Sequence, residues 1–229
     1  MLLRWILIGL VASAWSGMVR AQGPPPVLAW EHASSRYSLP VASDTASLDY
    51  QLLYRWYTQN DRFTTNWMWR TDRTAYPVFY GSPLLIWGLV AVDGVEAKTA
   101  YRFSVAHLST VGGTFVLKQL FKRQRPYVRH EQIVARRTSD IDLVERPDPH
   151  SFPSGHTALA VAVATSLSLE HPKPYVIIPS AVWAGSVGLS RMWLGLHYPS
   201  DVVLGALMGG GIAWVIHAFG NHIIPGQLR

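Results

Sequence analysis

The stretch SRMWLGLHYPSD, residues 190–201, lies between two of the most apolar segments of the chain. It contains three ionisable side chains, Arg191, His197 and Asp201, beside the large apolar residues Trp193 and Leu196. Burying charged or polar groups without partners costs free energy, so their presence here needs a reason. Either the stretch is a loop whose charges face water, or it belongs to a site that holds an anion.

The segments on either side of this stretch, and those before them, predict helices. Runs rich in Ala, Leu, Val and Gly occur at about 78–92, 101–121, 156–170, 175–189 and 201–219. They predict an all-α helical bundle of about five core helices. A membrane span needs about 20 apolar residues, with a range of roughly 17–25, and these segments are near the lower limit. They predict a transmembrane bundle, while their shortness leaves a soluble bundle as the alternative. Gly205 and Gly209 form a pair that suits close helix packing.

The composition agrees with a membrane protein that binds an anion. Of 229 residues, 49% are hydrophobic and 15% are charged, below the roughly 25% typical of soluble proteins. The net charge of +6 suits nucleic acid, an anionic membrane surface or a phosphate substrate. No nucleic-acid-binding motif occurs, which argues against nucleic acid. The absence of cysteine excludes disulfides, thiolate metal ligands and a cysteine nucleophile.

The N-terminal third differs from the rest of the chain. Residues 1–21 have a basic start, an apolar run and then small residues, which predicts a signal peptide or a first membrane span. Either would place residue 22 and those after it outside the cytoplasm. We expect 22–77 to be an extramembrane segment whose Trp and Tyr residues suit a helix at the membrane interface or a packed cap on the core. Residues 78–221 are the predicted helical core, and 222–229 a tail.

The number of helices then predicts the topology. Five alternating helices starting outside place the polar loop 122–152 and the stretch 190–201 on the outer side of the membrane. The short connections DGVEAK, 93–98, and EHPKP, 170–174, fall inside. These connections carry almost no net charge, so the excess of Lys and Arg usual in inner loops gives little support. The topology therefore depends on the N-terminus and the helix count.

The first group of polar residues on the outer side is KQLFKRQRP, residues 118–126. Lys118 and Arg125 are seven residues apart, or two helical turns, which predicts that both lie on one helix face. Pro126 then ends the helix or forces an extended exit. The alternative is a basic helix end that complements the helix dipole.

The second group is SFPSGHTALA, residues 151–160. Ser154 is a predicted helix N-cap, and Gly155 lets the backbone approach a ligand closely. The free N–H groups of a helix N-terminus bind phosphate, and His156 could give a proton to a group held there. The alternative is simple capping beside an exposed histidine.

The opening stretch is the third group. Arg191 can bind phosphate oxygens through two parallel hydrogen bonds. Asp201, four residues after His197, could accept the Nδ1 proton and leave Nε2 as a nucleophile. A single histidine near a helix start is more often structural. Three such groups at three matching helix ends instead favour a site for a tetrahedral oxyanion.

These three groups resemble the signature of the type 2 phosphatidic acid phosphatase family, which is Lys-x6-Arg-Pro, Pro-Ser-Gly-His and Ser-Arg-x5-His-x3-Asp. Every fixed position matches, and the helical layout resembles the family from about 78 to 219. Residues 22–77 lie outside the motifs. The matching residues are Lys118, Arg125, Pro126, Pro153, Ser154, Gly155, His156, Ser190, Arg191, His197 and Asp201.

The resemblance implies a mechanism without metal or cofactor. His197 would attack phosphorus to form a phosphohistidine, and Asp201 would orient and support it. His156 would protonate the leaving oxygen and then help water to attack. The implied phosphate-binding groups are Lys118, Arg125, Ser154, Gly155 and Arg191.

The resemblance also implies a lipid phosphatase of the bacterial inner membrane, with its site facing the periplasm or exterior. Candidate substrates are an isoprenyl diphosphate, phosphatidic acid, phosphatidylglycerol phosphate and a lipid A phosphate. The alternatives are a soluble secreted acid phosphatase, a vanadium haloperoxidase and an inactive membrane scaffold on the same fold. Neither the choice of substrate nor the oligomeric state can be predicted from the sequence.

Overall fold

The computed structural model describes residues 47–136 and 150–220. Within these residues the chain forms seven helices and no named strand. Five long helices correspond to the five predicted segments, which confirms the all-α bundle. Residues 1–21 and the tail 222–229 lie outside the described residues. The helices are α2 (Leu48–Tyr57), α3 (Arg62–Ala91), α4 (Ala97–Phe121), α5 (Pro126–Arg129), α7 (Gly155–Glu170), α8 (Pro174–Trp193) and α9 (Pro199–Phe219).

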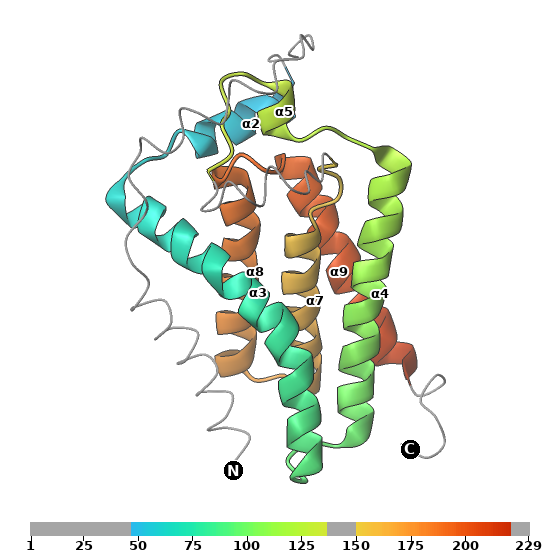
Figure 1. The fold of residues 1–229 in the computed structure, drawn as a ribbon. Coiled ribbons are helices and arrows are strands. Elements are labelled where there is room, and N and C mark those ends of the chain that lie inside the picture. Colours follow the sequence, from blue (N-terminus) through green and yellow to red (C-terminus); the bar gives the residue numbers. More distant parts are fainter. Residues whose placement is uncertain (1–46, 137–149, 221–229) are drawn as a thin grey trace.

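Helix α7 is the centre of the bundle. It contacts each of the other four long helices, α3, α4, α8 and α9. In Figure 1, α3 crosses the bundle diagonally, while the short helices α2 and α5 lie together at its upper end. The ends of α7, α8 and α9 that carry the second and third motifs lie below these two short helices.

Helix α3 begins much earlier than the sequence predicts, at Arg62 rather than near residue 78. Asp61 caps it by accepting a hydrogen bond from the Thr64 amide at 2.9 Å. The polar and aromatic first half lies in the segment expected to be extramembrane, and Pro77 lies inside the helix. The buried side chains recur every three or four residues, as one helix face requires. They include Met68, Thr71, Ala75 and Phe79.

Helix α2 is a packed cap, the second of the two alternatives for this part of the chain. Its buried residues Tyr50 and Leu53 pack against Ile133 and Tyr198. The indole of Trp56 donates a hydrogen bond to the carbonyl of Leu189 in α8, at 2.9 Å. The segment before the predicted core is therefore joined to the loops at the upper end of the bundle.

Glycine allows α7 and α9 to approach closely, as the pair Gly205 and Gly209 predicts. A Cβ added at Gly205 would lie 2.6 Å from the Ser154 carbonyl oxygen. One added at Gly209 would lie 1.9 Å from the Ala158 carbonyl oxygen, well inside van der Waals contact. Small residues at helix interfaces let backbones pack together in this way.

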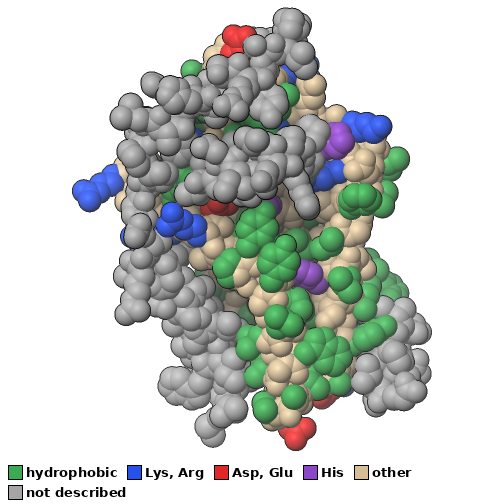
Figure 2. All heavy atoms as spheres, in the orientation of Figure 1, with side chains coloured by type: hydrophobic (Ala, Val, Ile, Leu, Met, Phe, Trp, Pro, Cys, Tyr) green, Lys and Arg blue, Asp and Glu red, His purple; other side chains and the backbone are tan. Residues whose placement is uncertain are grey.

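The outer surface of the long helices is apolar over most of their length. No Asp, Glu, Lys or Arg occurs at 74–91, 103–117, 155–169, 174–190 or 202–219. Figure 2 shows apolar side chains spread over the lower half of the visible face, with most Lys and Arg near the upper end. Helices α3 and α9 are long and apolar enough to cross a membrane. Small residues inside and large apolar residues outside suit lipid better than water. The large exposed residues include Leu84, Leu108, Phe115, Leu207 and Trp214.

Candidate active site

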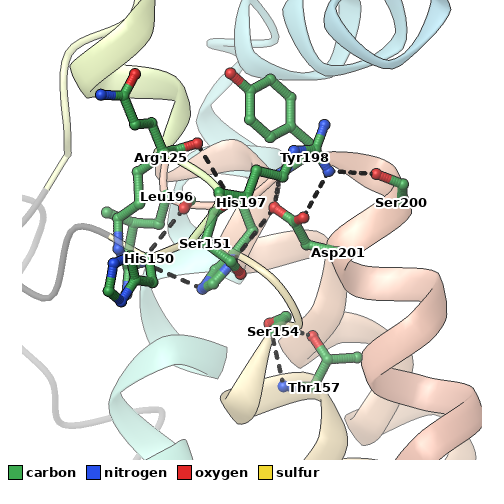
Figure 3. Close-up of polar contacts among 12 residues, drawn as sticks. Arg125, His150, Ser151, Ser154, Thr157, Leu196, His197, Tyr198, Ser200 and Asp201 are labelled. Carbon is green, nitrogen blue, oxygen red and sulfur yellow. Dashed lines mark hydrogen bonds and ion pairs between the residues drawn. The ribbon is translucent and has the colours of Figure 1, made fainter. Parts of the chain in front are cut away.

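The turn between α8 and α9 holds His197 in a buried position. Gly195 has a φ of 72°, and a Cβ there would lie 2.7 Å from the side chain of Ile133, so the turn requires glycine. His197 is only 2% exposed. Its Nδ1 lies 2.7 Å from the carbonyl oxygen of Ser151 (Figure 3). Because a carbonyl can only accept, Nδ1 carries the hydrogen and Nε2 keeps its lone pair.

The Nε2 atom of His197 lies among positive charges. The Nη1 atom of Arg125 is 3.2 Å from this nitrogen and also donates to the Leu196 carbonyl at 3.3 Å. Burial lowers the pKa of His197 well below its usual 6.5, and the charges of Arg125, Lys118 and Arg191 lower it further. The imidazole is therefore neutral at pH 7, with a lone pair directed toward cations.

Asp201 lies in the first turn of α9 and is fully buried. One carboxylate oxygen accepts from the Tyr198 amide at 2.8 Å, and the other accepts from Arg123 at 2.7 Å. Its nearest distance to Nδ1 of His197 is 3.7 Å, too long for a hydrogen bond. The Nδ1 acceptor is thus the Ser151 carbonyl and not the predicted Asp201. Sequence reasoning missed Ser151, because a backbone carbonyl carries no signal in a side-chain motif.

Lys118 and Arg125 both lie near enough to His197 for their charges to act on it, but they do not share a helix face. Helix α4 ends at Phe121, because Lys122 adopts a left-handed conformation with φ 46°. Arg125 is instead the N-cap residue of α5 and is mostly buried. Lys118 remains on α4 and donates to the His150 carbonyl at 3.2 Å. The prediction of one continuous helix across both residues is therefore wrong.

Ser154 is the N-cap of α7, as predicted. Its Oγ accepts from the Thr157 amide at 3.4 Å, and its own amide donates to the Asp201 carbonyl at 3.0 Å. This backbone bond joins the second motif to the third. The amides of Gly155 and His156 are in the first turn, where amides have no acceptor within the helix, so they suit an anion.

His156 lies on the side of the site that faces α3. Its ring packs edge-on against Tyr76, with centroids 4.9 Å apart, and against Phe79 at 5.7 Å. Both aromatic residues belong to the part of α3 that follows its polar first half. The predicted acid is therefore held against aromatic side chains and is not a freely exposed histidine.

Arg191 is almost completely buried at the end of α8, with 2% exposed. Its guanidinium forms an ion pair with Asp72 of α3. Among the described residues, its Nε atom has no hydrogen-bond acceptor. Sequence reasoning missed Asp72, because it lies far away in the chain in a segment outside the motifs.

Arg123 is a further cation near the site, and the motifs did not identify it. Besides Asp201, it binds Ser200 Oγ at 2.6 Å and Asp49 of α2 at 2.5 Å. Asp49 also accepts from the Ser200 amide at 2.9 Å. The charges of Asp201 and Asp49 raise the pKa of Arg123 against the opposing effect of burial. No cluster of three or more His, Cys, Asp or Glu residues that could hold a metal occurs in the described part of the chain.

The sequence is similar to that of a phosphatase from a mycobacterium. Decaprenylphosphoryl-5-phosphoribose phosphatase of Mycobacterium tuberculosis is 34% identical over 121 residues, which cover 51% of this chain and 56% of the relative. The chain thus spans about half the length of this curated relative.

Two crystal structures have similar folds. LpxE of Aquifex aeolicus has a TM-score of 0.58 and 26% identity, covering 78% of this chain and 99% of the other. The first transmembrane PAP2 type phosphatidylglycerolphosphate phosphatase from Bacillus subtilis has a TM-score of 0.61. At 21% identity, with 80% of this chain and 89% of the other covered, it supports the fold alone.

The family profile that matches the sequence covers residues 99–224. This range includes all three motifs, nearly all of α4, and helices α5, α7, α8 and α9. This is more than half of the chain, and it agrees with the fold, the buried histidine and the surrounding cations. The chain belongs to the PAP2 superfamily.

Proposed function

We propose that the protein is a metal-independent phosphatase that removes phosphate from a phosphomonoester or diphosphate of a lipid, through a phosphohistidine, at the outer face of a membrane. The observation that carries this proposal is the state of His197. It is buried and neutral, its Nδ1 is fixed by Ser151, and its Nε2 lone pair lies beside Arg125. A nucleophile held in this way needs no base to activate it.

In the first step, the Nε2 lone pair of His197 attacks phosphorus, and the bond from phosphorus to the leaving oxygen breaks. His156 gives its proton to that oxygen, so the leaving group departs as an alcohol or as a phosphomonoester. The imidazole of His197 becomes positively charged, and Asp201 at 3.7 Å compensates part of this charge.

In the second step, water attacks phosphorus and the bond from phosphorus to Nε2 breaks. His156, now neutral, takes a proton from the water. His197 recovers its lone pair and inorganic phosphate leaves. The two steps restore the protonation state of both histidines.

The negative charge of the phosphoryl group is compensated by side chains of this chain. Lys118, Arg125 and Arg191 are near enough to His197 to lower its pKa, and hence to a phosphoryl group bound there. Fixed cations and amides of this kind stabilise charge spread over the equatorial oxygens. The buried Nε of Arg191 would gain a phosphate oxygen as acceptor, while Asp72 holds the guanidinium in place.

A lipid substrate follows from where the site lies. The upper ends of the helices carry the polar groups, and the apolar outer surface begins directly below them. A headgroup could reach His197 while its hydrocarbon chain stays against the apolar helices. The relative from Mycobacterium tuberculosis is named a phosphatase of decaprenylphosphoryl-5-phosphoribose, a lipid-linked phosphate, which supports the same class here.

Phosphate release by wild type and His197→Ala tests the proposal. Both proteins are purified in detergent and given phosphatidic acid, phosphatidylglycerol phosphate, an isoprenyl diphosphate and lipid A. We expect wild type to hydrolyse at least one, and the variant to be slower by about 10⁴-fold or more because the nucleophile is lost. Wild type that is mixed with substrate carrying labelled phosphate and then quenched in alkali should retain labelled phosphate on the protein. Acid should remove this label, as expected for a phosphohistidine. Equal release by the two proteins would refute the proposal.

The orientation has its own test, because the chain contains no cysteine. Glu131→Cys places a single thiol on the exposed loop beside the site, and Glu96→Cys places one at the opposite end of the bundle, just before α4. A maleimide that cannot cross membranes should label the first variant in intact spheroplasts and the second only after lysis. The reverse pattern would place the site in the cytoplasm. Recovery of wild type in the soluble fraction without detergent would instead favour a secreted phosphatase.

A further inference from the structure

The cap helix α2 is connected to the buried carboxylate of Asp201 through one residue, Arg123. The connection runs from Asp49 to Arg123 and from Arg123 to Asp201, through contacts of 2.5 and 2.7 Å. Asp49 belongs to the part of the chain that no motif covers. Arg123 occupies one of the variable positions between Lys118 and Arg125.

Each oxygen of the Asp49 carboxylate has a defined partner. One accepts from the Ser200 amide at 2.9 Å, and the other from Ser200 Oγ and from Arg123, both at 2.5 Å. Ser200 is the second residue of α9. Asp49 therefore fixes the first turn of the helix that carries Asp201 and also satisfies one half of the Arg123 guanidinium.

Arg123 is fixed from the other side by the residue that follows the nucleophile. Its guanidinium carbon lies 4.0 Å from the centre of the Tyr198 ring. The Tyr198 amide donates to Asp201, and the Tyr198 hydroxyl lies 3.0 Å from Nε2 of the buried His130. Arg123 thus touches both Asp201 and the backbone neighbour of His197, without being one of the groups around Nε2.

Resting on the phosphatase function proposed above, we infer that Asp49 and Arg123 are positioning residues, which hold Asp201 in the orientation that supports His197 as it becomes charged. Helix α2 is then a working part of the site and not only a lid of packed side chains. Arg123 acts on Asp201 directly, and the negative charge of Asp49 acts through Arg123.

Steady-state kinetics in detergent test this inference, using the panel substrate that wild type hydrolyses fastest. The variants are Asp49→Asn, Arg123→Gln and the conservative Arg123→Lys. We expect kcat to fall about 100-fold in Arg123→Gln, because a charge-assisted hydrogen bond to the buried Asp201 is lost. In Asp49→Asn it should fall about tenfold, because the ion pair with the partly exposed Arg123 is lost. KM should stay within about twofold, because neither residue touches the phosphate. Arg123→Lys should lose less kcat than Arg123→Gln, because lysine keeps the positive charge but lacks the planar guanidinium that can bind two groups at once.

A double variant separates positioning from simple support of the fold. If Asp49 acts through Arg123, Asp49→Asn should have almost no further effect on kcat in the Arg123→Gln background. If the two residues acted independently, the fold-losses in kcat of the single variants would instead multiply in the double variant. Glu131→Gln, an exposed carboxylate on the same side, is the matched control and should keep the kcat of wild type.

Three results would overturn the inference: an unchanged kcat in both single variants, losses that multiply in the double variant, or losses confined to KM. These three results differ from those expected if the proposed phosphatase function itself is wrong. In that case wild type is inactive on the whole panel, or His197→Ala is as active as wild type.

Discussion

The two halves of the bundle are built in opposite ways. At the upper end, polar side chains are buried or half-buried and are joined by specific contacts, as in the chain of contacts from Asp49 to Asp201. In the lower half, the interior is packed with small residues such as Ala160 and Ala164, while large apolar residues face outward. The upper end therefore depends on the geometry of hydrogen bonds, and the lower half on how closely backbones approach. A substitution should affect mainly the rate in one region and mainly the stability in the other.

The largest effect should come from the upper end, with Asp201→Asn. The amide is almost the same size but removes the charge that supports His197 and that binds Arg123. We expect kcat to fall by about 10²–10⁴-fold, as when the carboxylate beside a catalytic histidine is neutralised in other enzymes. Thermal unfolding in detergent should change by only a few degrees. A variant with nearly normal kcat would show that Asp201 has no role in catalysis.

A pair of leucines tests whether the loss of stability on truncation depends on how deeply the side chain is buried. Leu53 on α2 is fully buried, whereas Leu207 on α9 is 65% exposed. Leu53→Ala should lower the free energy of unfolding by about 2–5 kcal/mol, because it leaves a cavity under the cap. Leu207→Ala should change it by less than about 0.5 kcal/mol. Chemical denaturation in the same detergent measures both, and equal costs would contradict the burial that distinguishes the two residues.

Two glycines of α9 provide a matched test of the close contact with α7. A Cβ at Gly209 would collide with the Ala158 carbonyl, while one at Gly211 would meet nothing within 4 Å. Gly209→Ala should destabilise the protein by about 1–3 kcal/mol through the forced shift of the helices. Gly211→Ala should be neutral or stabilise by up to about 1 kcal/mol, because alanine favours helix. Both should leave KM unchanged, and the unfolding midpoint is the measurement.

The smallest effect expected is a pH dependence of stability that comes from His197. Its pKa is lowered in the folded protein, so below about pH 6.5 the unfolded chain binds a proton that the folded chain does not. Stability should therefore fall as the pH drops below this value, by up to about 1.4 kcal/mol per pH unit, and not change above it. His197→Gln should remove this contribution. Unfolding midpoints at pH 7.5 and 5.5 measure the difference, and equal slopes in both proteins would argue against a neutral buried imidazole.

The sequence predicted the parts of the molecule that depend on local patterns. Apolar runs showed the five long helices, and the Ser154 cap follows from its position before an apolar run. The predictions failed where a single residue decides where a helix begins or ends, through its backbone conformation or its side-chain cap. The left-handed Lys122 ends α4 before Arg125, and Asp61 starts α3 well before the region where the apolar pattern becomes clear.

The partners of the site residues could not be predicted, for a different reason. Asp72 and Asp49 lie far from Arg191 and Arg123 in the chain, so only the folded structure brings these charges together. The Ser151 carbonyl that replaces Asp201 as the partner of Nδ1 has no side-chain pattern at all. Sequence motifs identified the groups expected to touch the phosphate, but not the groups that hold them in place.

The hydrogen bond from the Ser154 amide to the Asp201 carbonyl has a practical consequence. It joins the predicted phosphate cradle to the turn of the nucleophile through main-chain atoms only. A substitution of His197 leaves this link intact, so a catalytically dead protein should keep its cradle and cations in place. Such a variant would be a substrate trap. Purified from native membranes in mild detergent, it should carry its own lipid with it, and mass spectrometry of the extracted lipid would then identify the substrate.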